Sequence, residues 1–94
     1  MTHASPTLLI NPTITSRRSA RFPLSLLHLA AALERNGRDS RIIDGNVDRD
    51  FVDDTLRAME QDAFAAVGVS VMGGPQLAPA IAVSRAIRER HPSV

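Results

Sequence analysis

The residues best suited to hold a ligand lie in a turn that contains two glycines. Residues 65–72 (AAVGVSVM) form a nearly continuous apolar run, and Gly73 and Gly74 separate it from a pattern with helical spacing. Such a run is typical of a parallel strand covered on both faces. Glycine allows close approach of the backbone, and the next helix supplies unpaired N–H groups. The segment predicts a turn for an anionic or amide-rich ligand, although a tight strand-to-helix connection explains the glycines equally well.

Two further segments carry polar groups that could face the same ligand. Asn11 and Pro12 end the first apolar strand, and an asparagine amide both donates and accepts hydrogen bonds. Capping of its own loop is the competing role for Asn11. Asp44, Gly45 and Asn46 close the second strand, in the place of the acidic residue that holds a ribose in dinucleotide folds. The first turn has no GxGxxG pattern, so a nicotinamide site is a weak interpretation.

Three strands alternate with three helices along the chain, which predicts an α/β fold. Helices are expected from Pro23 to Asn36, from Asp50 as N-cap through Met59, and, with Pro79 in its first turn, in a third segment that His91 and Pro92 end. Aspartates at 53 and 54 suit the positive end of the second helix. His28 is expected to be a partly buried structural residue. The strands are expected at Thr7–Asn11, Ser40–Asp44 and residues 65–72.

This order predicts a Rossmann-like (flavodoxin-like), doubly wound parallel sheet of βαβαβα type with strand order 2-1-3. In such sheets the ligand crevice lies at the carboxyl ends of the strands, where the strand order reverses. Here that point is between the first and third strands. The loops that meet there are residues 11–21 and 70–76, with residues 44–46 on the other side of the first strand.

Composition excludes several classes of function. The 94 residues are enough for one domain, with 44% hydrophobic and 22% charged residues. A net charge of +1 and only three aromatic residues argue against binding to nucleic acid or an anionic membrane. The absence of cysteine excludes disulfides and thiolate metal sites in this segment. No apolar run approaches the length of a membrane span, so a cytoplasmic protein is expected.

Four segments of the chain carry a family pattern: LLINP at 8–12, FPLSLLHLAAALERNG at 22–37, IIDGNVD at 42–48 and VGVSVMGGPQLAPAIAVSRAIRERHP at 67–92. In this order they resemble the cobalamin-binding N-terminal domain of radical SAM enzymes. The resemblance covers nearly the whole chain. It implies that residues 1–94 are a partial cobalamin-binding domain, truncated before strands four and five. It also implies a parent enzyme with a radical SAM domain, a [4Fe-4S] cluster and S-adenosylmethionine, in which this piece itself catalyses nothing.

The resemblance also implies roles for individual residues. Ser70 matches a serine that lies close to the nucleotide tail of cobalamin, and Met72 stands at the leucine position two residues later. The turn and Gln76 would offer amides to the corrin side chains or to the tail phosphate. The DxHxxG motif that supplies a histidine ligand to cobalt is missing, so binding is expected base-off, without a protein histidine. The complete set of expected cofactor-binding residues is Asn11, Pro12, Asp44, Gly45, Asn46, Ser70, Val71, Met72, Gly73, Gly74 and Gln76.

Two alternatives to a cobalamin module remain open. One is a flavodoxin-like or receiver-like domain, although the chain has Asn11 and Pro12 where a receiver needs acidic residues for Mg²⁺. The other is a structural piece that forms a dimer through its exposed third strand.

Overall fold

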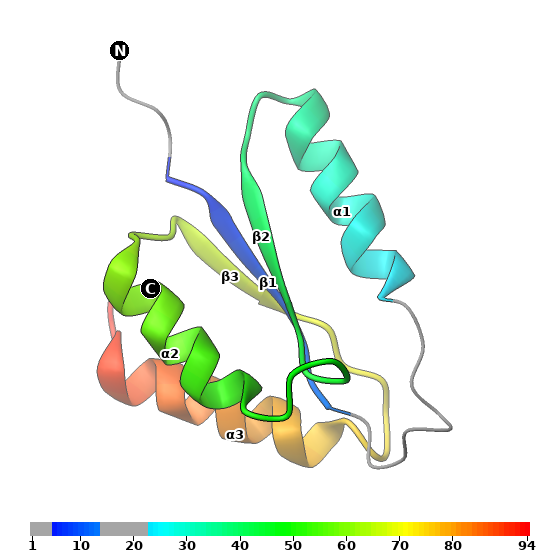
Figure 1. Ribbon diagram of the computed structural model, residues 1–94, viewed down its shortest axis with the longest axis vertical. Coiled ribbons are helices and arrows are strands. Elements are labelled where there is room, and N and C mark those ends of the chain that lie inside the picture. Colours follow the sequence, from blue (N-terminus) through cyan, green and yellow to red (C-terminus); the bar gives the residue numbers. More distant parts are fainter. Residues whose placement is uncertain (1–4, 14–22) are drawn as a thin grey trace.

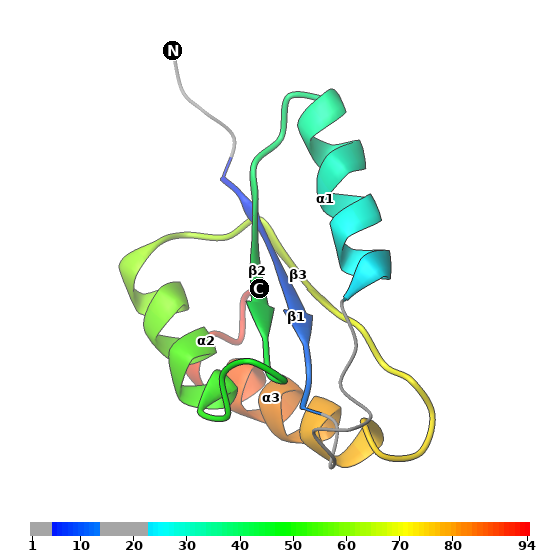
Figure 2. The same cartoon turned by 45° about the vertical axis from the view of Figure 1, so that its right-hand side comes forward.

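The computed structural model describes residues 5–13 and 23–94, and these form an α/β layer structure (Figure 1). Three parallel strands, β1 (Thr7–Asn11), β2 (Ser40–Asp44) and β3 (Ala66–Val69), lie in the order β2-β1-β3. Helix α1 (Leu24–Arg35) covers one face, and helices α2 (Phe51–Gln61) and α3 (Leu77–Arg90) cover the other (Figures 1 and 2). The predicted fold class and strand order are therefore confirmed.

The main core lies between the sheet and the pair α2 and α3. Leu8 and Ile10 of the central strand are fully buried, and they pack with Phe51 and Met59 of α2 and with Val83 of α3. Because side chains alternate along a strand, Leu9 points to the opposite face, towards α1. An added Cβ at Gly68 of β3 would lie 3.1 Å from Leu9 Cδ2, so glycine makes room for the leucine there.

Helix α1 buries less of its apolar surface than the sequence suggests. Leu26, Leu27, Ala30, Ala31 and Leu33 have the helical spacing of an apolar stripe, but only Leu26 among them is buried, and Leu27 is 45% exposed. His28 is exposed, so the expectation that it is partly buried is wrong. Helix α1 packs on β1 and β2, and Ala66 of β3 is exposed. The face of β3 that belongs to the α1 layer therefore lacks a helix within the described part of the chain.

The end of β3 and the cap of α2 differ from the sequence prediction. Strand β3 ends at Val69, which pairs with Ile10 of β1, whereas the apolar run predicts strand as far as residue 72. Asp50 precedes α2 but its side chain makes no capping hydrogen bond. Instead its backbone N–H donates to Asp48 Oδ1 at 3.0 Å, and this bond shapes the turn that enters the helix. None of the helices in the described ranges has the length and apolar character needed to cross a bilayer.

Candidate functional site

The structure brings the predicted loops together at the carboxyl edge of the sheet. Strands β1 and β3 are direct neighbours, and the N–H of Ser70 donates to the carbonyl of Ile10 at 2.9 Å. Residues 44–46 follow β2 on the other side of β1. Of the loop at 11–21, residues 14–21 lie outside the described residues. The site therefore rests on residues 11–13, 44–46 and 70–76.

The side chain of Gln76 links the β3–α3 turn to the end of β1 through hydrogen bonds. Its side chain is buried, and Nε2 donates to Asn11 Oδ1 at 3.0 Å and to the Pro12 carbonyl at 2.8 Å. Its Oε1 accepts from the N–H of Met72 at 2.8 Å. The side-chain amide of Gln76 is thus used within the fold, and Gln76 is a buried residue at the start of α3 rather than an exposed one.

Asn11 extends these side-chain hydrogen bonds towards β2. Its buried side chain donates through Nδ2 to Asp44 Oδ1 at 3.1 Å, and its carbonyl accepts from the N–H of Gly45 at 2.7 Å. Asp44 Oδ1 also accepts from the N–H of Asn46 at 3.0 Å. Asn11 therefore joins all three loops, which is a wider role than capping its own loop. One side-chain network, from Asp44 through Asn11 to Gln76, fixes the carboxyl edge.

Gly45 and Pro12 serve packing at this edge. A Cβ on Gly45 would lie 2.6 Å from the Thr13 backbone nitrogen and 2.7 Å from Thr13 Oγ1, so only glycine fits. Thr13 Oγ1 donates to the Gly45 carbonyl at 2.7 Å. Pro12 is fully buried. These residues bring the loops after β1 and β2 into close contact.

Residues 71–74, called here the exposed turn, form the accessible part of the site. Val71 is 50% exposed and Met72 65% exposed, and both glycines are exposed. Gly74 has a φ of +85°, which favours glycine. Gly73 has no such requirement, and a Cβ added to it would meet nothing within 4 Å. The exposed turn thus presents apolar side chains and two exposed glycines at the point where the strand order reverses, and the N–H of Met72 within it donates to Gln76.

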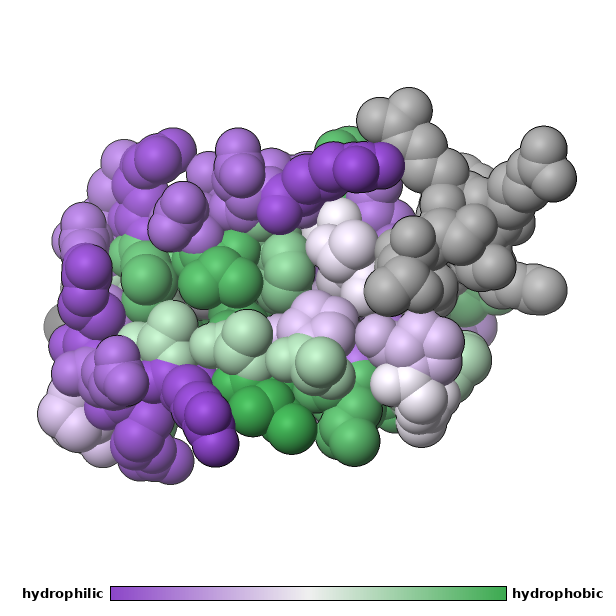
Figure 3. Space-filling view, turned by 90° about the horizontal axis from the view of Figure 1, so that it is seen from below, coloured by the Kyte–Doolittle hydropathy of each residue, from purple (hydrophilic) through white to green (hydrophobic). Residues whose placement is uncertain are grey.

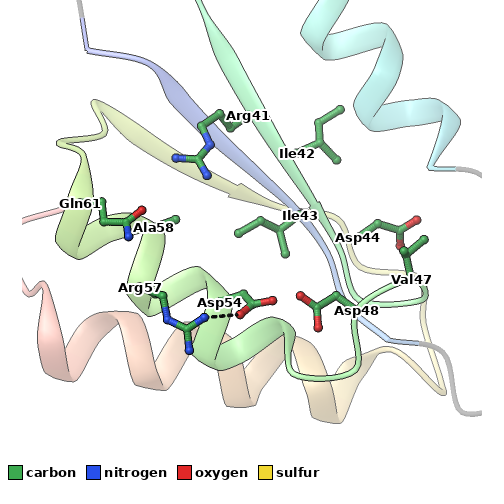
Figure 4. A pocket seen from close by; sticks show the side chains of 10 residues that line it. All are labelled: Arg41, Ile42, Ile43, Asp44, Val47, Asp48, Asp54, Arg57, Ala58 and Gln61. Atoms are coloured by element: carbon green, nitrogen blue, oxygen red, sulfur yellow. Dashed lines mark hydrogen bonds and ion pairs between the residues drawn. The ribbon is translucent and has the colours of Figure 1, made fainter.

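A separate groove of about 470 Å³ lies between β2 and α2 (Figure 4). Its floor includes Ile43 and Ala58, and its rim carries aspartates and arginines, including the pair Asp54–Arg57 at 3.2 Å. Asp44 is the one predicted site residue that lines it. The described residues include no group of three or more histidine, cysteine, aspartate or glutamate side chains placed to hold a metal ion. Asp44 and Asp48 accept backbone N–H groups of the turns that follow them, at 3.0 Å each, and Asp54 pairs with Arg57.

Neither histidine in the described ranges lies in the network at the carboxyl edge. His28 is an exposed residue of α1, and His91 follows α3 beside Ala63, Phe64 and Ala65, where the chain enters β3 at the opposite end of the sheet. His3 lies outside the described residues.

Comparisons with protein-family models, curated proteins and solved structures find no match to this chain.

Proposed function

We propose that this chain is a binding module that holds cobalamin over the carboxyl edge of its sheet, against the exposed turn. The observation that carries this proposal is the combination of Gly73, whose lack of a side chain serves no contact among the described residues, with the exposed apolar side chains of Val71 and Met72. A corrinoid is large and flat, with an apolar ring and amide-bearing side chains. An exposed turn with apolar side chains and accessible N–H groups suits both parts of such a ligand.

The polar network assigns different tasks to the predicted residues. Val71, Met72, Gly73 and Gly74 would contact the corrinoid, with Ser70 beside them. Asn11 and Gln76 are positioning residues in this proposal, because their amides hold the turn in place through hydrogen bonds of 2.8–3.1 Å. Pro12, Gly45 and Asp44 with Asn46 support the same edge from the β1 and β2 loops.

The ligand would be held base-off without a protein histidine. The positions of His28 and His91 support this part of the proposal, since neither belongs to the carboxyl-edge network. When bound, cobalamin supplies a cobalt centre suited to methyl transfer or radical chemistry. The chain itself binds and orients the corrinoid and presents one of its faces.

The sequence resemblance also supports a proposal about the rest of the parent protein. We propose that the partner is a radical SAM domain of the same parent chain, which carries the [4Fe-4S] cluster and S-adenosylmethionine. A cytoplasmic location belongs to the same proposal.

Equilibrium dialysis of the chain against hydroxocobalamin, read by absorption spectroscopy, tests the function. We expect retained cobalamin with a base-off spectrum that His28→Ala leaves unchanged. Gly73→Val places a branched side chain on the exposed turn and should weaken binding about tenfold or more, equivalent to about 1.4 kcal/mol, with stability unchanged within about 0.5 kcal/mol. Met72→Glu should also weaken binding, while Leu29→Glu, at another exposed apolar residue, should not. The absence of any retained cobalamin would refute the proposal.

Dialysis of the same chain against FMN tests the flavodoxin-like and receiver-like alternatives. Asn11 occupies the end of β1 and its amide is already bonded to Asp44 and Gln76, so this position offers neither a carboxylate for Mg²⁺ nor a free acceptor for phosphoryl transfer. This geometry argues against a receiver-like domain, and dialysis against FMN tests the flavodoxin-like one. FMN retention without cobalamin retention would favour a flavodoxin-like module.

A further inference from the structure

The hydrogen bonds of the carboxyl-edge network run in one direction, and backbone groups set that direction at the exposed turn. The N–H of Met72 can only donate and the carbonyl of Pro12 can only accept, so the Gln76 amide must turn Oε1 to the first and Nε2 to the second. The same Nε2 also faces Asn11 and therefore requires an acceptor there, which is Oδ1 at 3.0 Å. The orientation of the Gln76 amide thus follows from the backbone of the loops around it.

The same requirement passes through Asn11 to Asp44. Because Oδ1 of Asn11 accepts from Gln76, its Nδ2 is left as a donor, and Asp44 Oδ1 accepts from it at 3.1 Å. An ionised carboxylate only accepts hydrogen bonds, so it cannot serve an Asn11 amide turned the other way. The N–H of Asn46 donates to the same oxygen at 3.0 Å, which holds the carboxylate in place. The network therefore requires an acceptor at residue 44 and an amide at residue 11.

Both amides of the network lie where water cannot easily replace a lost partner. Asn11 is 6% exposed and Gln76 is 4% exposed. Gln76 stands at the start of α3, and the end of the molecule where this helix lies has hydrophobic residues at its centre and hydrophilic ones at its margins (Figure 3). A buried polar group without a partner is costly, so a change at one end of the network should alter the other end.

We infer that Asp44 is a remote positioning residue for the exposed turn. Its carboxylate acts through the amides of Asn11 and Gln76, and it fixes the direction in which Gln76 holds the N–H of Met72. Without an acceptor at residue 44 the Asn11 amide is free to turn, and Gln76 then loses the acceptor that keeps its own amide in place. Asp44 thus affects the ligand site without touching the ligand. Its effect on affinity rests on the proposed function, whereas its effect on the turn does not.

Amide hydrogen exchange of the chain without ligand, followed by NMR, tests the effect on the turn. Asp44→Leu keeps a side chain of similar size but removes the acceptor, and exchange at Met72 should become about threefold faster or more. The N–H of Ser70, which donates to Ile10 in the sheet, should keep its native rate and so shows that the fold is intact. Asp44→Asn can place an oxygen where Asp44 Oδ1 lies, so it should restore the rate at Met72 to within about twofold. Unchanged exchange at Met72 in Asp44→Leu, or equal effects of leucine and asparagine, would overturn the inference.

Exchange of the two side-chain types between residues 11 and 44 gives a second test that does not depend on leucine. Asn11→Asp sets two carboxylates against each other and should weaken cobalamin binding in equilibrium dialysis about tenfold or more. Asp44→Asn added to this variant supplies an Nδ2 donor to the new carboxylate and should recover most of the loss. Gln61→Glu makes the same change from amide to carboxylate at an exposed residue and should leave binding unchanged. A double variant that binds as weakly as Asn11→Asp would overturn the inference.

The two measurements distinguish a failure of this inference from a failure of the proposed function. If the native chain retains no cobalamin, the proposed function is refuted, and the exchange rates at Met72 still decide whether Asp44 positions the turn. If the native chain retains cobalamin and Asp44→Leu binds it equally well, the proposed function stands and the inference is refuted.

Discussion

Replacement of Gln76 by leucine is the sharpest test of the network that fixes the carboxyl edge. Leucine has a similar volume and suits a buried site, so the change mainly removes hydrogen bonds. Nε2 of Gln76 no longer donates to Asn11 Oδ1 and the Pro12 carbonyl, and Oε1 no longer accepts from Met72. Met72 is exposed and its N–H can turn to water, whereas the other two partners belong to buried residues.

The expected cost follows from these two buried acceptors. A buried polar group left without a partner costs about 1–3 kcal/mol, and leucine recovers part of the loss through apolar burial. We therefore expect a decrease of about 2–3 kcal/mol in the free energy of unfolding. A domain of this size has roughly 5–14 kcal/mol in total, so the change is large. It corresponds to a Tm lower by roughly 10–20 °C.

Urea unfolding followed by circular dichroism measures this change. Gln61→Leu is the matched control, because Gln61 is an exposed glutamine at the end of α2 and its replacement should stay within about 0.5 kcal/mol. Gln76→Glu should destabilise more than Gln76→Leu at neutral pH, since a carboxylate would face two oxygen atoms that now accept from Nε2. A loss below about 0.5 kcal/mol for Gln76→Leu would refute the role assigned to the network.

Four further substitutions, one of them a control, probe the fold. Gly45→Ala should destabilise by about 1–3 kcal/mol in urea unfolding, because its Cβ would lie 2.6 Å from the Thr13 backbone nitrogen; an unchanged midpoint would contradict the close approach. Leu8→Ala should cost about 2–5 kcal/mol by the same measurement, since the side chain is fully buried in the central strand, and a cost below about 1 kcal/mol would place it outside the core. Gly74→Ala, at a φ of +85°, should cost about 1–2 kcal/mol in thermal unfolding, whereas Gly73→Ala should cost under about 0.5 kcal/mol; equal costs would refute the difference in backbone requirement.

The local sequence determined the elements of this protein and their order. Short apolar runs bounded by proline, glycine and asparagine predicted β1 and β2 at their observed bounds. The helical spacing of Ala80, Val83, Ser84 and Ile87 predicted the buried face of α3, and all of these except the exposed Ser84 are buried. Strand order 2-1-3 also followed, because right-handed connections leave few arrangements for three strands and three helices. These features depend on backbone preferences and on hydrophobic periodicity, and both can be read from residues that are close together in the sequence.

The tertiary structure alone decided which polar groups are available and where strand β3 ends. Asn11 and Gln76 are 65 residues apart, and nothing in their spacing indicates that their amides bond to each other in a buried site. The end of β3 depends on where its partner β1 ends, which is a property of the pair. Hydrogen bonds between distant residues and the burial of a face depend on three-dimensional neighbours. The sequence pattern could therefore predict a ligand site at the carboxyl edge, but it could not tell which residues there are free to contact a ligand and which only hold the loops in place.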